Sequence, residues 1–293
     1  MERTPLKLTP KLAVIGAGVM GRNHLRAAQA AGIPIAAVID TDKTCARAAA
    51  DAYGCDVSET LDGFDAAIIA VPTAAHAPMT LPLLHAGLHC LVEKPFAASE
   101  AECRALIDTA AIRQRVVQVG HIERFNPAIE ALFSHAPRNL RTLTARRMGP
   151  ASARVTDISV VVDLMVHDLD IVLALTSQPV TGVQAKGTRD HAEATLTFAD
   201  GAIATLTASR TWPERVRDLA VTGDASYVVD YIAKTLRIDN GAPETFTGDA
   251  LAAQLKSFTA CIETGTRPRV SGETALAVMK TAWRIEQALG IAP

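Results

Sequence analysis

Apolar runs and mixed stretches alternate along the first 120 residues of the chain. The apolar runs are short and do not alternate with polar residues, as expected for parallel strands that are covered on both faces. The sequence therefore predicts an α/β fold with a doubly wound parallel sheet. Its strands are expected at Leu12–Ile15, Ile35–Ile39, Asp65–Val71, Leu88–Val92 and Val116–Val119, with helices beginning near Val19, Asp42, Ala74 and Ser99.

The pattern changes after Gly120. Strand-like alternation runs from Val180 to Ile238, and the dipeptides Asp200-Gly201 and Gly223-Asp224 are typical of hairpin turns. We therefore expect two domains: residues 1–120, and an α+β domain over residues 121–293 with an open, mainly antiparallel sheet. Two helices near Ala250–Glu263 and Gly272–Leu289 end the chain, and the last is a candidate to pack back on the first domain.

A glycine-rich turn follows the first predicted strand in the pattern G-x-G-x-x-G. The first glycine permits a tight turn, the second lets a pyrophosphate approach, and the third lets the helix pack on the strand. The second strand ends about 20 residues later in an acidic residue, which is suited to ribose hydroxyls and disfavours a 2'-phosphate. We therefore expect NAD, bound by Gly16, Gly18, Val19, Met20, Gly21 and Asp40.

Two further strand ends carry candidate chemistry, because ligands bind at the carboxyl ends of parallel strands. One strand is followed by Val71-Pro72-Thr73, where Thr73 is suited to cap the next helix, and His76 lies in that helix's first turn. Another ends in Glu93-Lys94-Pro95. We expect the cofactor to be bound by Val71, Pro72, Thr73, His76, Glu93 and Lys94. An ordinary surface salt bridge is the alternative for Glu93 and Lys94.

A predicted helix from about Val162 carries Asp163, His167 and Asp170. Residues three and four apart share a helix face, so the three side chains form one polar stripe. If the stripe faces a cleft, it is a catalytic base with its orienting carboxylate; if it faces solvent, the helix is an ordinary amphipathic one. A core histidine is the further alternative for His167.

Composition excludes several other classes. The 293 residues are 49% hydrophobic and 20% charged with a net charge of -2, so nothing indicates nucleic acid or an anionic membrane surface as a partner. No segment approaches the roughly 20 apolar residues of a membrane span, and the N-terminus lacks an apolar signal core, so we expect a cytoplasmic protein. Five scattered cysteines without a C-x-x-C pair disfavour disulfides and zinc, and no metal site is expected. His85 and His89 are four apart, but Gly87 is expected to end the helix between them.

The glycine motif, Glu93-Lys94-Pro95 and the Asp163-x-x-x-His167-x-x-Asp170 spacing together resemble the glucose–fructose oxidoreductase/inositol dehydrogenase/MocA (Gfo/Idh/MocA) family, over nearly the whole chain. The resemblance implies an N-terminal Rossmann domain and a nicotinamide-dependent reaction of a sugar or cyclitol. The residues 121–127 and 163–170 are most similar to a bacterial subgroup, the UDP-N-acetylglucosamine 3-dehydrogenases of lipid A biosynthesis. That subgroup implies a sugar nucleotide substrate and a ketone that a partner aminotransferase consumes. The chain departs from the family where many members have a Gly-Gly pair, at Ile158–Val161.

The resemblance and the residue chemistry lead to one mechanism. His167 is expected to take the hydroxyl proton, Asp163 to hold His167 or the hydroxyl, and Lys94 to stabilise the developing alkoxide. Substrate contacts are expected from Arg124, Asn126 and Asp170, with Arg146, Arg147 and Arg154 as further cations for a diphosphate. A dehydrogenase of another UDP-sugar, free sugar or cyclitol, and a non-catalytic NAD-binding sensor, are the alternatives.

The second domain also suggests self-association. Leu196, Phe198 and Leu206 are interpreted as placing apolar side chains on both faces of its sheet. An exposed apolar sheet face usually marks an interface, so we expect a homodimer or a homotetramer.

Overall fold

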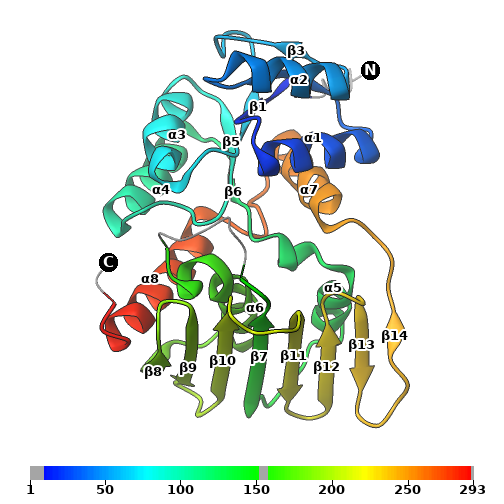
Figure 1. Cartoon of the computed structure of the whole chain (residues 1–293), viewed down its shortest axis with the longest axis vertical. Coiled ribbons are helices and arrows are strands. Elements are labelled where there is room, and N and C mark those ends of the chain that lie inside the picture. Colours follow the sequence, from blue (N-terminus) through cyan, green and yellow to red (C-terminus); the bar gives the residue numbers. More distant parts are fainter. Residues whose placement is uncertain (1–9, 152–157, 292–293) are drawn as a thin grey trace, which may run out of the picture. The chain divides into compact units, whose positions relative to one another are not determined.

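A six-stranded parallel sheet forms the first part of the fold (Figure 1) in this computed structural model, which describes residues 10–151 and 158–291. The strand order is β3-β2-β1-β4-β5-β6, and β1 and β4 are fully buried, as their unbroken apolar sequences require. The strands are β1 (Leu12–Ile15), β2 (Ile35–Ile39), β3 (Asp56–Val57), β4 (Ala66–Ile69), β5 (His89–Val92) and β6 (Val117–Val119). The connecting helices are α1 (Val19–Ala31), α2 (Lys43–Tyr53), α3 (His76–His85) and α4 (Glu100–Arg113). The predicted doubly wound sheet is confirmed.

Residues from the far end of the chain complete this first unit. It comprises the chain up to Gly120 together with Leu251–Leu276, whereas the second unit comprises 121–250 and the residues from Ala277 onward. The Gln118 side-chain amide donates to the Gln254 carbonyl oxygen at 3.0 Å, which ties β6 to α7 (Ala250–Thr264). The division drawn from the sequence assigned α7 to the second domain, because contacts made 136 residues apart leave no local signal.

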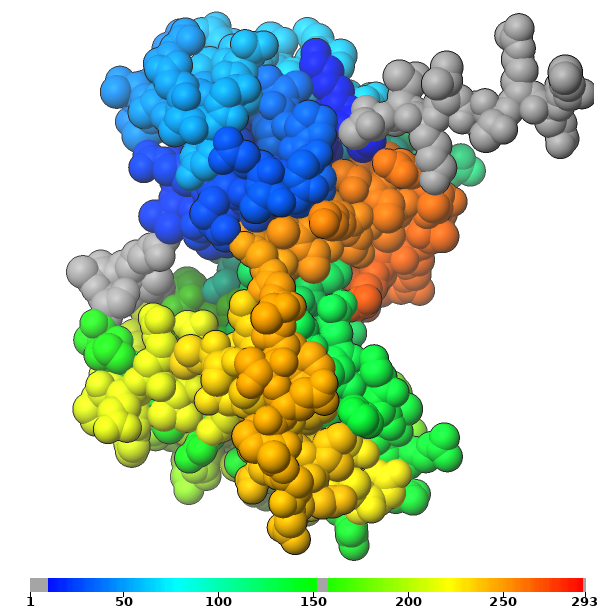
Figure 2. All heavy atoms as spheres, turned by 90° about the vertical axis from the view of Figure 1, so that its right-hand side faces the viewer, coloured from blue at the N-terminus to red at the C-terminus, as the bar shows by residue number. Residues whose placement is uncertain are grey.

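An eight-stranded sheet organises the second unit, in the order β14-β13-β12-β11-β7-β10-β9-β8. All of its neighbouring strands are antiparallel except β7 and β10, which confirms a mainly antiparallel sheet. The strands are β7 (Thr142–Met148), β8 (Val180–Gly187), β9 (His191–Phe198), β10 (Ile203–Ser209), β11 (Val216–Thr222), β12 (Ser226–Asp230), β13 (Thr235–Ile238) and β14 (Glu244–Thr245). Figure 2 views the edge of the sheet that β13 and β14 form.

One face of this sheet is apolar and the other is polar. Leu196, Phe198 and Leu206 are all buried on the inner face, where they pack with α5 (Pro127–Ser134) and α6 (Val166–Thr176). The outer face carries polar side chains such as Thr144 on β7 and the pair Arg146–Asp218. The interpretation that both faces are apolar is therefore wrong. The expected homodimer or homotetramer stays a prediction, but an apolar outer face of the sheet no longer supports it.

Two negative findings concern the described residues alone. None of their helices combines the length and apolar character that crossing a membrane requires. Within the same ranges, no three His, Cys, Asp or Glu side chains are grouped in a way that would hold a metal ion.

Candidate active site

The glycine turn of the first unit has the shape of a phosphate cradle. Gly16 has a φ of +99°, and a Cβ there would lie 2.5 Å from the carbonyl oxygen of Ala70. A Cβ on Gly21 would lie 1.8 Å from the Gly16 carbonyl oxygen, so α1 packs closely on the turn only because residue 21 lacks a side chain. A Cβ on Gly18 would meet nothing within 4 Å, and no side chain caps α1. The turn therefore presents open backbone N–H groups to an anion.

Asp40 supports this turn. One carboxylate oxygen accepts from the backbone N–H of Ala17 at 2.6 Å, and the other accepts from that of Asp42 at 2.8 Å. The nearby Lys43 is bound to Glu59 at 2.6 Å. The end of β2 therefore presents carboxylate to a ribose, which favours hydroxyls over a 2'-phosphate.

The segment after β4 differs from the expectation. Thr73 begins a 3-10 turn (Thr73–Ala75) before α3, and neither the turn nor α3 has a side-chain cap, so the capping role predicted for Thr73 is wrong. His76 opens α3 and is 1% exposed. Its Nδ1 lies 2.7 Å from the carbonyl oxygen of Pro95, and its Nε2 lies 3.0 Å from that of Val71. Both ring nitrogens are thus engaged by the backbone.

Glu93, which precedes Lys94 in the chain, is buried. Its Oε1 lies 2.7 Å from Nε2 of His24 on α1, and its Oε2 accepts from the backbone N–H of Lys94 at 3.2 Å. Burial raises the pKa of Glu93, but the hydrogen bond and charge of His24, with the charge of Lys94, outweigh it and leave the pKa below its ordinary value. The surface salt bridge considered for Glu93 and Lys94 is therefore excluded, because Glu93 is 6% exposed and pairs with His24.

The polar stripe predicted to be catalytic lies where a helix of the second unit changes its geometry. Val161–Met165 form a single π-helical turn that contains Asp163, and α6 follows with His167 in its first turn. Asp163 and His167 are both half-buried. The ring of His121, which is 1% exposed, lies 6.5 Å from that of His167 in an edge-on arrangement. Single π turns occur frequently at functional sites.

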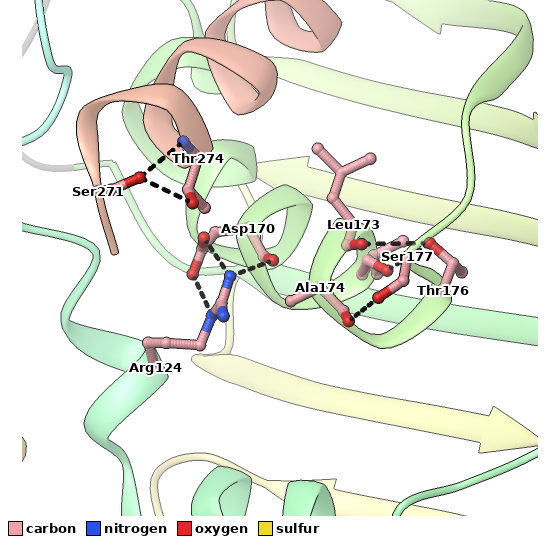
Figure 3. Close-up of polar contacts among 9 residues, drawn as sticks. Arg124, Asp170, Leu173, Ala174, Thr176, Ser177, Ser271 and Thr274 are labelled. Carbon is pink, nitrogen blue, oxygen red and sulfur yellow. Dashed lines mark hydrogen bonds and ion pairs between the residues drawn. The ribbon is translucent and has the colours of Figure 1, made fainter. Parts of the chain in front are cut away.

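The residues predicted to bind substrate form polar contacts within the protein. Arg124 and Asp170 form a buried pair with two side-chain hydrogen bonds of 2.8 and 2.7 Å, and Arg124 also donates to the Asp170 carbonyl oxygen at 3.1 Å (Figure 3). Asn126 donates to the Glu123 carboxylate and to the Tyr231 carbonyl oxygen, and it caps α5. These contacts favour structural roles for all three predicted residues.

Of the arginines predicted as further cations for a diphosphate, Arg146 and Arg147 both bind carboxylates of the protein. Arg147, 2% exposed, donates twice to Asp168 and once to Glu123, over the ring of Tyr231. Burial lowers the pKa of Arg147, but the two carboxylates outweigh it and raise the pKa. Arg146 binds Asp218 on the outer face of the sheet, and Arg154 lies outside the described residues.

Arg217 is a candidate that the sequence reasoning missed. It lies on β11 directly opposite Arg147 of β7, and so on the inner side of the sheet. Burial, followed by the like charge of Arg147, lowers its pKa. No described residue forms a hydrogen bond or ion pair with its guanidinium. An arginine within a predicted strand does not by itself indicate a binding role. Only the strand register shows that Arg217 lies opposite Arg147.

Family models match both units of the chain. Residues 11–121 match the oxidoreductase family with the NAD-binding Rossmann fold, and residues 136–229 match the GFO/IDH/MocA C-terminal domain. The chain belongs to the GFO/IDH/MocA oxidoreductase family. It is accordingly an NAD-binding oxidoreductase, and the glycine cradle and the carboxylate of Asp40 fit that cofactor.

Relatives within the family differ in their substrates. The chain is 34% identical to the UDP-N-acetylglucosamine 3-dehydrogenase of Acidithiobacillus ferrooxidans, over 85% of this chain and 87% of that protein. A solved structure of that dehydrogenase, GnnA, superposes with a TM-score of 0.92 at 32% identity, covering 96% and 98% of the two chains. Inositol 2-dehydrogenase 1 of Saccharopolyspora erythraea is 31% identical over 66% of this chain and 62% of its own.

Proposed function

We propose that this family member oxidises the 3-hydroxyl of UDP-N-acetylglucosamine to a ketone, with NAD+ as the oxidant. The observation that carries this proposal is the extent of the similarity to the Acidithiobacillus dehydrogenase, which covers 85% of the chain. The similarity to an inositol dehydrogenase covers 66% at comparable identity. Another inositol dehydrogenase matches 94% of this chain, but at 25% identity, so identity and coverage together favour the sugar nucleotide.

The chain's own residues perform the proton chemistry. Bound NAD+ supplies the acceptor for hydride. His167 takes the hydroxyl proton on Nε2, because its Nδ1 is buried. Lys94 stabilises the negative charge that develops on the oxygen as the proton leaves, and Asp163, half-buried in the π turn before His167, positions the hydroxyl.

We assign the diphosphate of the substrate to Arg217. Burial and the like charge of Arg147 disfavour the charged guanidinium more than the nearby carboxylates of Glu123 and Asp168 favour it. A diphosphate relieves both effects and matches the donor fork of arginine. Arg124 and Arg147 are less suited, since their carboxylate partners already occupy them.

A 3-keto sugar nucleotide forms unfavourably, so we propose that an aminotransferase consumes it, as in lipid A biosynthesis. The test incubates the enzyme with NAD+, UDP-N-acetylglucosamine, an aminotransferase and glutamate. A 3-amino sugar nucleotide is expected to accumulate, and Arg217→Ala should raise KM for the UDP-sugar by about 10-fold or more, the scale of a lost charged hydrogen bond. If neither NADH nor aminated product forms while free inositol is oxidised readily, the substrate assignment fails and the family assignment stands.

A further inference from the structure

Lys94 is fixed by its two neighbours in the chain, and each neighbour contacts a different buried histidine. On the N-terminal side, Glu93 contacts Nε2 of His24 at 2.7 Å. A carboxylate only accepts, so His24 donates this hydrogen bond from the second turn of α1. His24 is 0% exposed.

On the C-terminal side, Pro95 is held by α3. The Pro95 carbonyl oxygen lies 2.7 Å from Nδ1 of His76, which is closer than the 3.0 Å between Nε2 and the Val71 carbonyl oxygen. A carbonyl oxygen only accepts, so a hydrogen bond to Pro95 requires the ring proton of His76 to be on Nδ1. His76 thus connects the residue after Lys94 to the end of β4.

The end of β6 confines the same segment from a third direction. A Cβ on Gly120 would lie 2.9 Å from Oε2 of Glu93 and 3.1 Å from its Cα. Glu93 thus occupies the space that a side chain at residue 120 would need and packs on the backbone after β6, which confines the chain before Lys94 in addition to the contact with His24.

We propose that His24 and His76 are positioning residues for Lys94, acting through the Glu93 side chain and the Pro95 carbonyl group respectively. The proposal rests on the role given to Lys94 in the proposed function. Neither histidine contacts the substrate in this account. Each keeps the lysine ammonium where the developing alkoxide needs it, and a misplacement of about 1 Å there lowers turnover by up to about 100-fold.

The two histidines use different ring nitrogens, which permits a crossed test. The amide nitrogen of Asn is as many bonds from the backbone as Nδ1 of His, and that of Gln is as many bonds away as Nε2. His24 works through Nε2, so His24→Gln should retain turnover and His24→Asn should lose it. His76 works through Nδ1, so His76→Asn should retain turnover and His76→Gln should lose it.

The expected losses are about 10- to 100-fold in kcat for His24→Asn and His76→Gln, with the Kd for NAD unchanged within about threefold. The two retaining variants should lie within about threefold of the wild-type kcat. His85→Gln, an exposed position on α3, is the matched control and should change neither quantity. A merely structural role would move melting temperatures and leave the kcat of the folded enzyme unchanged.

Hydrogen exchange of the backbone amides over residues 93–97 gives a readout that needs no substrate. It should accelerate at least about threefold in His24→Asn and His76→Gln and stay near wild type in the other three variants. If wild-type enzyme produces no NADH, the proposed function fails and the exchange pattern alone decides the proposal. Uniform kcat and uniform exchange across the variants, or equal losses in Asn and Gln at each position, would overturn it.

Discussion

The buried pair Arg124–Asp170 gives the sharpest quantitative prediction. Asp170 is fully buried and Arg124 is 7% exposed, and two short hydrogen bonds join their side chains. Asp170→Ala removes both carboxylate acceptors of these two hydrogen bonds from the buried guanidinium. Removing one partner of a buried ion pair costs about 3–5 kcal/mol. For a protein of this size that corresponds to a melting temperature lower by about 6–20 °C.

The assay is thermal unfolding followed by circular dichroism, together with KM for the sugar nucleotide well below the transition. Asp218→Ala is the matched control, since it removes the partner of Arg146 on the outer face, where the loss should be at most about 1 kcal/mol. A structural pair leaves KM within about threefold. An unchanged melting temperature with KM raised about 10- to 150-fold, the scale of lost charged hydrogen bonds, would refute the structural role and restore the predicted substrate contact.

Three further outcomes are expected. At matched concentrations, turnover should be faster with NAD than with NADP, and Asp40→Ala should reduce this preference. Equal turnover of the wild type with the two cofactors would contradict the prediction. Lys94→Ala and His167→Ala should each lower turnover by about 100-fold or more while NAD binding, measured by calorimetry, persists; wild-type turnover in either would remove its role. The pKa of Glu93 is depressed in the folded protein, so its stabilisation is present above the ordinary value of 4.5 and lost as pH falls through the folded value. The melting temperature of wild type should therefore exceed that of Glu93→Gln at pH 6 and approach it at pH 3, and a constant gap would contradict the shift.

The parallel sheet of the first unit followed from the sequence because its signals are local. An apolar run, three glycines at fixed spacing and an acidic strand end together require a parallel sheet with a phosphate-binding turn, as Gly16 and Gly21 show by their close backbone approaches. The interpretation that Leu196, Phe198 and Leu206 place apolar side chains on both faces of the second sheet failed for the opposite reason. Leu196 pairs with Ala204, and Leu206 with Ala194, a register that the strand sequences do not encode alone.

The partners of the polar residues in the candidate site could not be predicted from the sequence either. Arg124 and Asp170 were each recognisable as polar residues near a functional motif, but they lie 46 positions apart and only the fold shows that they bind one another. The π turn at Val161–Met165 also changes the helical period, so the face shared by Asp163 and His167 does not follow from a spacing of four. His76 was expected at the cofactor, and its long-range bond to Pro95 was invisible in the sequence.

Oxidation at carbon 3 of a UDP-sugar is the reaction proposed for this NAD-binding oxidoreductase. The most direct measurement follows deuterium from UDP-N-acetylglucosamine labelled at carbon 3, in the coupled reaction with aminotransferase and glutamate, by mass spectrometry of the reduced cofactor. Oxidation at carbon 3 predicts reduced nicotinamide that carries one deuterium, formed about 100-fold or more slowly when Lys94 or His167 is replaced by Ala. Unlabelled reduced cofactor, formed while the deuterium remains on the sugar, would contradict it.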